Sequence, residues 1–397
     1  MVNATSDRVI PLGSGLPSIP ERLLLAHARG EVLFIAGAGI SQPAKLPDFR
    51  GLVRKVYERL DAAVYAVIDS IPTTGGSHLH MDLSRLTNQQ AAEVVRFKRE
   101  EYDIVLGMLE RRIDGHSNRK SRVRQAVATE LRTPGVKPAP IHRALMSLAD
   151  RGGVVTIATT NFDLLLEDAA KRARPVVQTY ALGGIPRPGR SAEFNGVLHI
   201  HGVLDRDPAR TSDLIVTDND FGEFYLRRRV VPDFIHDAAR LFHLVLVGYR
   251  ANDPPMRYLF NAVAADGSRF EDLKERFTFE GNNDPIVLED WRSRAITPIP
   301  YDAANDHVAL LETLERWATL SAINGKRSFV DAEVKRIVRS SRRASSDADR
   351  DLFDHLIRRS DVNERVRLSV LASKQKADLG WLDVIAAIAT ESDGEHH

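Results

Sequence analysis

Short apolar runs rich in β-branched residues recur along the chain, and longer segments with helical periodicity separate them. The runs lie at 32–36, 154–158, 197–200, 214–216, 244–247 and 296–301. Their apolarity is continuous rather than alternating, which is typical of strands buried on both faces of a parallel sheet. The intervening segments include helical patterns at 163–173 and 307–320. Strands that alternate with helices predict an α/β fold with a Rossmann-like, doubly wound parallel sheet.

Two regions depart from this alternation. From about residue 52 to 150 the chain shows helical periodicity and no convincing strand, which predicts a large helical insertion after the first strand. From residue 326 the chain becomes polar and serine-rich and then shows further helical patterns. We therefore expect a core domain over 20–325 and a small helical C-terminal region over 326–397.

Composition and charge are ordinary for a soluble globular protein. Of the 397 residues, 43% are hydrophobic and 27% are charged, and the formal net charge is +1. This balance indicates no global field that would attract nucleic acid or a membrane. Basic clusters at 111–125, 227–229 and 335–343 have acidic residues nearby and match no nucleic-acid-binding signature. We expect these clusters to be solvated helix faces, and we expect no direct nucleic-acid binding.

The sequence contains no cysteine, which excludes disulfides and cysteine-ligated zinc. Its first residues lack the charged-then-apolar organisation of a secretory signal. No apolar run approaches the length of a membrane span. We therefore expect a cytoplasmic protein without a membrane partner.

A glycine turn follows the first apolar run, in the segment FIAGAGISQPAKLPDFRG at 34–51. Gly37 and Gly39 permit a tight turn and a close approach of the backbone to a ligand. The amides at the start of a following helix are a natural phosphate site. However, Gln42 stands where the dinucleotide-binding fingerprint has its third glycine, and the chain has no P-loop motif. The turn alone therefore fits an ordinary strand–helix connection as well as a nucleotide site.

Four ordered segments resemble motifs of the sirtuin family. GAGIS followed by PDFRG resembles the family's first nucleotide-binding segment, where the loop wraps NAD. TTNFD at 159–163 resembles its TQNID segment, HIHG at 199–202 its HG pair, and VGYRANDPP at 247–255 its late GTS-type turn. The segments at 138–153 and 290–302 resemble the helix before TQNID and the closing strand. The likeness covers about residues 20–320, in separate islands.

The chain also departs from the pattern of protein-deacylating sirtuins. Those enzymes hold a four-cysteine zinc module, which this chain cannot form. Thr160 replaces the usual glutamine, and Phe162 replaces an isoleucine. The chain therefore resembles the divergent bacterial sirtuin-like domains that hydrolyse NAD, many of which act in defence against phage.

The resemblance implies a set of site residues. His201 matches the catalytic histidine and Asn161 would orient ribose hydroxyls or the attacking water, so these two are the predicted catalytic residues. Asp163 would accept from the nicotinamide carboxamide, Phe49 would cover the reacting ribose, and Arg50 would face the pyrophosphate. The predicted NAD-binding residues are Gly37, Ala38, Gly39, Ser41, Asp48, Phe49, Arg50, Asp163 and Gly248.

Each of these residues also has a structural interpretation. Asn161 or Asp163 could cap the helix that follows them, and an aromatic ring and a salt bridge commonly anchor a loop such as that of Phe49 and Arg50. His199 and His201 could be two arms of a metal site, but the sequence offers no evident third ligand, so we expect no metal.

The predicted function is hydrolysis of NAD to nicotinamide and ADP-ribose, with NAD as the substrate. Such an activity would need regulation, so we expect an NAD-depleting effector of bacterial anti-phage defence that is gated by homo-oligomerisation or by a partner. Family analogy suggests a HerA-like ATPase or a short Argonaute as that partner. The alternatives are an NAD-dependent protein deacylase and a non-catalytic nucleic-acid-binding or assembly module.

Overall fold

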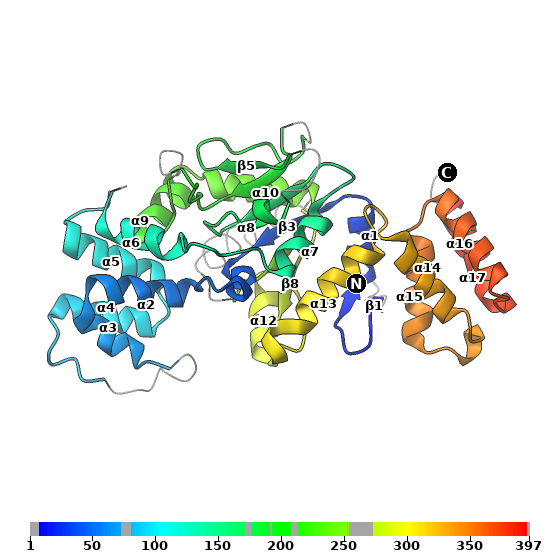
Figure 1. The fold of residues 1–397 in the computed structure, drawn as a ribbon, viewed down its shortest axis with the longest axis horizontal. Coiled ribbons are helices and arrows are strands. Elements are labelled where there is room, and N and C mark those ends of the chain that lie inside the picture. Colours follow the sequence, from blue (N-terminus) through cyan, green and yellow to red (C-terminus); the bar gives the residue numbers. More distant parts are fainter. Residues whose placement is uncertain are drawn as a thin grey trace.

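The computed structural model describes residues 8–72, 81–118, 120–170, 176–190, 193–207, 213–251, 253 and 273–394. Three parts lie in a row, as Figure 1 shows: a helical insertion, a central sheet covered by helices, and a C-terminal helical region. Among the described residues, none of the helices combines the length and the apolarity needed to cross a membrane.

The central sheet has seven parallel strands in the order β5-β6-β4-β3-β7-β8-β9. The strands are β3 Val32–Ala36, β4 Thr156–Thr159, β5 Gln178–Ala181, β6 Gly196–His199, β7 His243–Val247, β8 Arg276–Glu280 and β9 Thr297–Pro300. Within this sheet the chain forms β3 first, adds β4, β5 and β6 on one side of it, and then returns to place β7 on the other side. The predicted α/β fold with a doubly wound parallel sheet is therefore confirmed.

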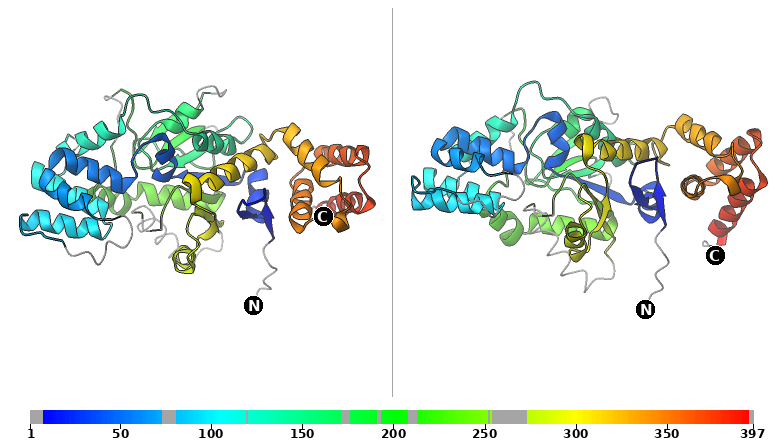
Figure 2. Two further views of the ribbon diagram at one scale, coloured as in Figure 1. Left: turned by 60° about the horizontal axis from the view of Figure 1, so that its bottom comes forward. Right: turned by 90° about the horizontal axis from the view of Figure 1, so that it is seen from below.

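Successive residues of the central strands β3, β4, β6 and β7 point into two separate hydrophobic clusters. On β3, Phe34 belongs to the cluster on one face, whereas Leu33 and Ile35 belong to the cluster on the other face. This burial on both sides explains why the strands are continuously apolar. The first face is covered by α1 Glu21–Ala28, α7 Pro140–Ala149, α8 Leu165–Ala169 and α13 Ala304–Leu320, and the second by α10 Val230–Leu241 and α12 Pro285–Ser293 (Figure 2).

The helical insertion has a hydrophobic cluster of its own. Its helices are α2 Phe49–Leu60, α3 Ala62–Asp69, α4 Asn88–Lys98, α5 Tyr102–Asp114 and α6 Arg122–Leu131. Arg112 ties them together, because its guanidinium donates to Glu93 at 2.8 Å and to Asp61 at 2.6 Å. Helix α7 also falls within 52–150, but it packs on the first face of the sheet.

The C-terminal region comprises α14 Arg327–Ile337, α15 Asp347–Arg358, α16 Val362–Lys374 and α17 Leu379–Gly394. Its apolar residues continue the cluster on the first face of the sheet. At the junction, Arg358 donates to both carboxylate oxygens of Glu21 at 2.9 and 3.0 Å. A small hairpin of β1 Val9–Pro11 and β2 Ser18–Pro20 lies beside α15. These contacts join the region to the sheet.

Some predicted elements differ from the structure. The strand predicted at 214–216 is wrong: these residues are buried but adopt no regular structure. The helix predicted at 163–173 is the short α8, and residues 171–173 of that range lie outside the described residues. The apolar pattern also does not reveal β5, an exposed polar edge strand, or β8, in which charged and polar residues alternate with phenylalanines.

Candidate active site

The strand order reverses between β3 and β7, because β4 to β6 lie on one side of β3 and β7 to β9 lie on the other. Doubly wound sheets bind ligands in a crevice at the carboxyl ends of the strands at such a point. Gly37 follows β3 and Gly248 follows β7, and the two strands end at the same level. Ala38 then begins a short 3-10 helix, η1 Ala38–Ala44. The predicted glycine turn therefore lies at this crevice.

Glycine is required here because the two turns touch each other. The N–H of Gly37 donates to the carbonyl of Val247 at 2.8 Å, and the N–H of Gly39 donates to the carbonyl of Gly248 at 3.0 Å. A Cβ atom on Gly37 would lie 2.7 Å from the oxygen of Gly248. Gly248 itself has a φ of +81°, which favours glycine. The glycines thus allow close packing of one loop on the other.

A polar cluster joins the ends of β3 and β4. The side-chain amide of Asn161 donates to the carbonyl of Gly37 at 3.1 Å and to the hydroxyl of Ser41 at 3.0 Å. The Ser41 hydroxyl donates to Asp163 Oδ2 at 2.9 Å. Ser41 and Asn161 are buried. The structure therefore brings together four of the predicted site residues, Gly37, Ser41, Asn161 and Asp163, from two separate segments.

Asp163 has a second role at the start of α8. Its Oδ1 accepts from the backbone N–H of Leu165 at 3.1 Å, while Oδ2 faces Ser41. Burial raises the pKa of Asp163. The carboxylate thus caps the helix and also belongs to the polar cluster.

His142 on α7 completes this cluster, and the sequence gives no specific signal for it. Its Nδ1 accepts from the N–H of Ala139 at 3.1 Å, so Nε2 carries the proton and faces the Ser41 hydroxyl at 3.5 Å. Burial lowers the pKa of His142 to about 4, which keeps the ring neutral.

His199 supports the backbone of Asn161. Its Nδ1 lies 2.7 Å from the carbonyl of Asn161, and its Nε2 lies 2.9 Å from Glu167 Oε1 on α8. Both ring nitrogens face oxygen acceptors, so both carry protons and the ring is positively charged. Burial alone would lower the pKa of His199, but the Glu167 carboxylate outweighs burial and raises it.

His201 lies just past the end of β6 and packs on the second face of the sheet. Its Nε2 lies 2.6 Å from the hydroxyl of Tyr225, and the ring of Phe221 meets it edge-on at 5.5 Å. Burial lowers the pKa of His201 to about 3, so the ring is neutral. His201 therefore contacts Tyr225 and Phe221 rather than the cluster around Asn161.

The two histidines are not arms of one metal site. His199 contacts α8 on the first face, whereas His201 contacts the aromatic rings of the second face. Within the part of the chain that the structure describes, no group of three or more potential metal-binding side chains comes together.

The loop after the glycine turn leads into the helical insertion. Asp48 caps α2 by accepting from the N–H of Gly51 at 2.7 Å, and Arg250 approaches its other oxygen at 3.8 Å. Phe49 packs edge-on against Tyr102, with ring centroids 5.9 Å apart.

Arg50 differs from its expected position. It is buried, and its guanidinium donates to the carbonyl of Ile71 at 2.6 Å and lies over the ring of Phe97. The orientation of Arg50 thus differs from the expected one toward a pyrophosphate, because the guanidinium enters the insertion. Of the alternative, a loop anchored by an aromatic ring and a salt bridge, the aromatic contact is present, but Arg50 bonds to backbone carbonyls and a tyrosine hydroxyl rather than to a carboxylate.

Tyr249 is a further residue of the crevice that the sequence does not single out. Its hydroxyl donates to the carbonyl of Ala36 at 2.9 Å and lies 3.0 Å from the hydroxyl of Thr160. It belongs to the fourth motif at 247–255, of which residues 252, 254 and 255 lie outside the described residues.

The arrangement offers a carboxylate, a side-chain amide and a hydroxyl beside a glycine turn. Such groups bind the hydroxyls and amides of a polar ligand, and their position at strand ends gives them a fixed geometry.

Comparison with known proteins finds a family match over part of the chain. Residues 155–299 match the family model of the SIR2-like domain, and this range runs from β4 to all but the last residue of β9. The chain is 32% identical over 392 residues to an uncharacterized protein, y4cA, of Sinorhizobium fredii. The match covers 94% of this chain but only 29% of that protein, so the chain spans less than a third of its relative's length.

Solved structures of Sir2 proteins are similar at low sequence identity. A structure of Sir2 enzymes matches 75% of this chain and 96% of its own, with 15% identity and a TM-score of 0.34. A Sir2 homologue in complex with NAD matches 75% of this chain and 92% of its own, with 15% identity and a TM-score of 0.35. These TM-scores are low, and the fold is defined by the strand order itself. The similarity to the SIR2-like domain therefore rests on residues 155–299.

Proposed function

We propose that this chain hydrolyses NAD to nicotinamide and ADP-ribose. The observation that carries the proposal is the contact of Asn161, Ser41 and Asp163 at the ends of β3 and β4. Two of these residues lie within the range that matches the SIR2-like domain.

The chemistry requires the bond between the ribose carbon and nicotinamide to break. Water then bonds to that carbon, neutral nicotinamide leaves, and a proton passes to a base or to solvent. The transition state has oxocarbenium character, so fixed polar groups around the ribose lower its energy. We assign Asp163 to the carboxamide and Asn161 to the ribose hydroxyls or the water.

His201 is our candidate for the base. A histidine must be neutral before it can accept a proton, and burial keeps the ring of His201 in that state. Its low pKa makes it a weak base while it stays buried. We therefore propose that Tyr225 releases Nε2 when the substrate binds.

Regulation is part of the proposal, since an unrestrained NAD hydrolase would exhaust its host. We propose an effector of bacterial anti-phage defence that is gated by self-association or by a partner such as a HerA-like ATPase or a short Argonaute. Protein deacylation is the weaker alternative, because this chain has no cysteine with which to build the zinc module of deacylating sirtuins.

The test is mass spectrometry of NAD after incubation with the purified chain, with and without an acylated peptide. Free ADP-ribose and nicotinamide without peptide would support hydrolysis, and acyl-ADP-ribose would support deacylation instead. Asn161→Ala and His201→Ala should each abolish NAD loss without lowering thermal stability enough to unfold the chain. Asn324→Ala is the matched control, because Asn324 is exposed and contacts Asp150 ahead of β4. Full turnover in both site variants would reject the assignment.

A further inference from the structure

The segment 214–225 surrounds His201. The N–H of Ile215 donates to the backbone carbonyl of His201 at 2.9 Å, Phe221 packs against its ring, and the hydroxyl of Tyr225 contacts Nε2. The second half of the segment consists of helix α9 Asp218–Phe221 and the first residues of the π-helix η4 Gly222–Arg227. The backbone and the ring of the histidine are thus both held by one stretch of chain.

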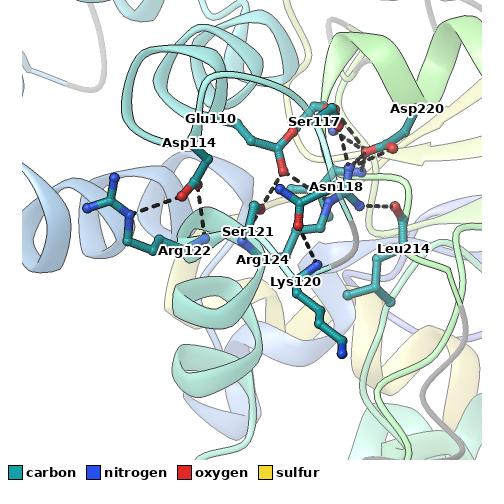
Figure 3. Close-up of polar contacts among 12 residues, drawn as sticks. Glu110, Asp114, Ser117, Asn118, Lys120, Ser121, Arg122, Arg124, Leu214 and Asp220 are labelled. Carbon is teal, nitrogen blue, oxygen red and sulfur yellow. Dashed lines mark hydrogen bonds and ion pairs between the residues drawn. The ribbon is translucent and has the colours of Figure 1, made fainter.

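The same segment is fastened to the helical insertion by Arg124 of α6. Its Nη1 donates to the carbonyl of Leu214 at 2.8 Å, and its Nη2 donates to both carboxylate oxygens of Asp220 at 2.7 and 2.8 Å. Asp220 Oδ2 in turn accepts from the N–H groups of Val216 and Thr217, each at 2.9 Å. Figure 3 shows Arg124 reaching Leu214 and Asp220 from the insertion.

The surroundings of Arg124 make this connection rigid. Arg124 is buried, and its Nε donates to Glu110, which is fully buried. Charge-assisted hydrogen bonds of this kind are strong, and removing one partner leaves a buried group unsatisfied. The apolar residues of the segment also connect the insertion to the sheet. Leu214 and Val216 pack into the hydrophobic cluster of the insertion, whereas Ile215 packs into the cluster on the second face of the sheet.

We propose that Arg124 is a positioning residue for His201, and that the helical insertion sets the orientation of this histidine through the segment 214–225. The proposal rests on the proposed function, in which His201 is the base. A displacement of α6, such as a partner bound to the insertion would cause, moves Leu214 and Asp220 and therefore the three groups that hold His201. Because a shift of about 1 Å can lower a rate about a hundredfold, this route is sufficient to gate the site.

A neighbouring arginine provides the matched control. Arg122 lies on the same helix, but its guanidinium donates to Asp114 at 3.0 Å and its side chain is 57% exposed. Figure 3 shows it directed toward Asp114, away from Leu214 and Asp220. Arg122→Lys therefore repeats the chemical change without touching the segment around His201.

The experiment compares Arg124→Lys with Arg122→Lys in the full chain. Lysine keeps the positive charge beside Glu110 but cannot reach Leu214 and both oxygens of Asp220 at once. Two readouts are measured: the kcat and KM for NAD, and the ¹⁵N ring resonances of His201, assigned with His201→Asn. We expect Arg124→Lys to lower kcat roughly tenfold, with KM within about twofold, and to shift the His201 resonances. Arg122→Lys should change neither.

The outcomes separate this proposal from the proposed function. Unchanged His201 resonances in Arg124→Lys would overturn the positioning role, whatever happens to kcat. If the wild-type chain does not consume NAD, the proposed function fails, and the resonance shift alone decides whether Arg124 positions His201. If Arg124→Lys does not fold, Asp220→Asn replaces it, because it weakens the same link while Arg124 keeps its contact with Glu110; the same shift is then required.

Discussion

His199 and His201 are two residues apart, yet their surroundings are opposite. His199 lies on the first face of the sheet between a carbonyl and the Glu167 carboxylate, and it carries a positive charge. His201 lies on the second face among aromatic rings, hydrogen-bonds with Tyr225, and is kept neutral by burial. The comparison teaches that burial, and whether a carboxylate offsets it, determines the protonation of a histidine, whereas the motif HIHG only determines where each ring is placed.

The largest effect that tests this comparison is expected in acid. Burial lowers the pKa of His201 to about 3 and those of His142 and His27 to about 4, while unfolded histidines titrate near 6.5. The unfolded state therefore binds more protons, so stability present above pH 6.5 is lost as the pH falls. Each of these histidines should lower the free energy of unfolding by about 2 kcal/mol between pH 7 and pH 5. Urea unfolding at both pH values measures this. In His201→Asn, the free energy of unfolding should depend less steeply on pH, because the contribution of one histidine is gone. An equally steep pH dependence in this variant would contradict the buried, neutral state of His201.

An intermediate effect is expected from Glu167→Gln. The pKa of His199 is raised in the folded state, so its contribution is fully present below about pH 6.5 and is lost as the pH rises through the raised pKa. Removing one member of a buried ion pair should cost about 3 kcal/mol at pH 6. Denaturant unfolding at pH 6 and pH 9 should show that the difference between the variant and the wild type narrows at high pH. A difference that is constant with pH would mean that His199 is neutral. Glu193→Gln is a suitable control, since Glu193 is exposed and pairs with Arg190.

The smallest effect is expected from Tyr225→Phe. This change removes the hydroxyl that hydrogen-bonds with His201 and leaves a buried ring nitrogen without that partner. We expect a loss of about 1–2 kcal/mol in the free energy of unfolding, with little change in its pH dependence. Tyr301→Phe is the matched control, because its hydroxyl contacts His307 in a half-buried site away from the sheet crevice. Equal losses in the two variants would show that the contact of Tyr225 has no special role.

The fold was largely predictable, because β3 and β7 are buried on both faces and are therefore unbroken apolar runs. The pattern at 214–216 looks the same in sequence but arises differently: alternate residues enter two separate clusters, and the backbone pairs with His201 and Asp220 instead of a strand. A run of three residues cannot distinguish these cases.

The residues of the candidate site were predictable where they lie in recognisable motifs, and those outside the motifs were not. Asn161, Asp163 and Ser41 lie in segments with recognisable patterns, and they do meet in space. His142 and Glu167 lie on helices that also carry other polar residues, so the sequence does not single them out, and only the packing of those helices brings them to the cluster. Arg50 is the opposite case. Its motif predicted a contact with a ligand, whereas in the structure its guanidinium hydrogen-bonds to the insertion.

The contact between the turns after β3 and β7 has a consequence for how substitutions there are interpreted. With Gly37 and Gly39 lying against Gly248, an alanine at any of these positions forces two neighbouring strand ends apart or strains a left-handed backbone. An alanine scan through the turn would therefore report on the closure of the sheet at this edge. Loss of activity in such variants says nothing by itself about which backbone atoms face a ligand.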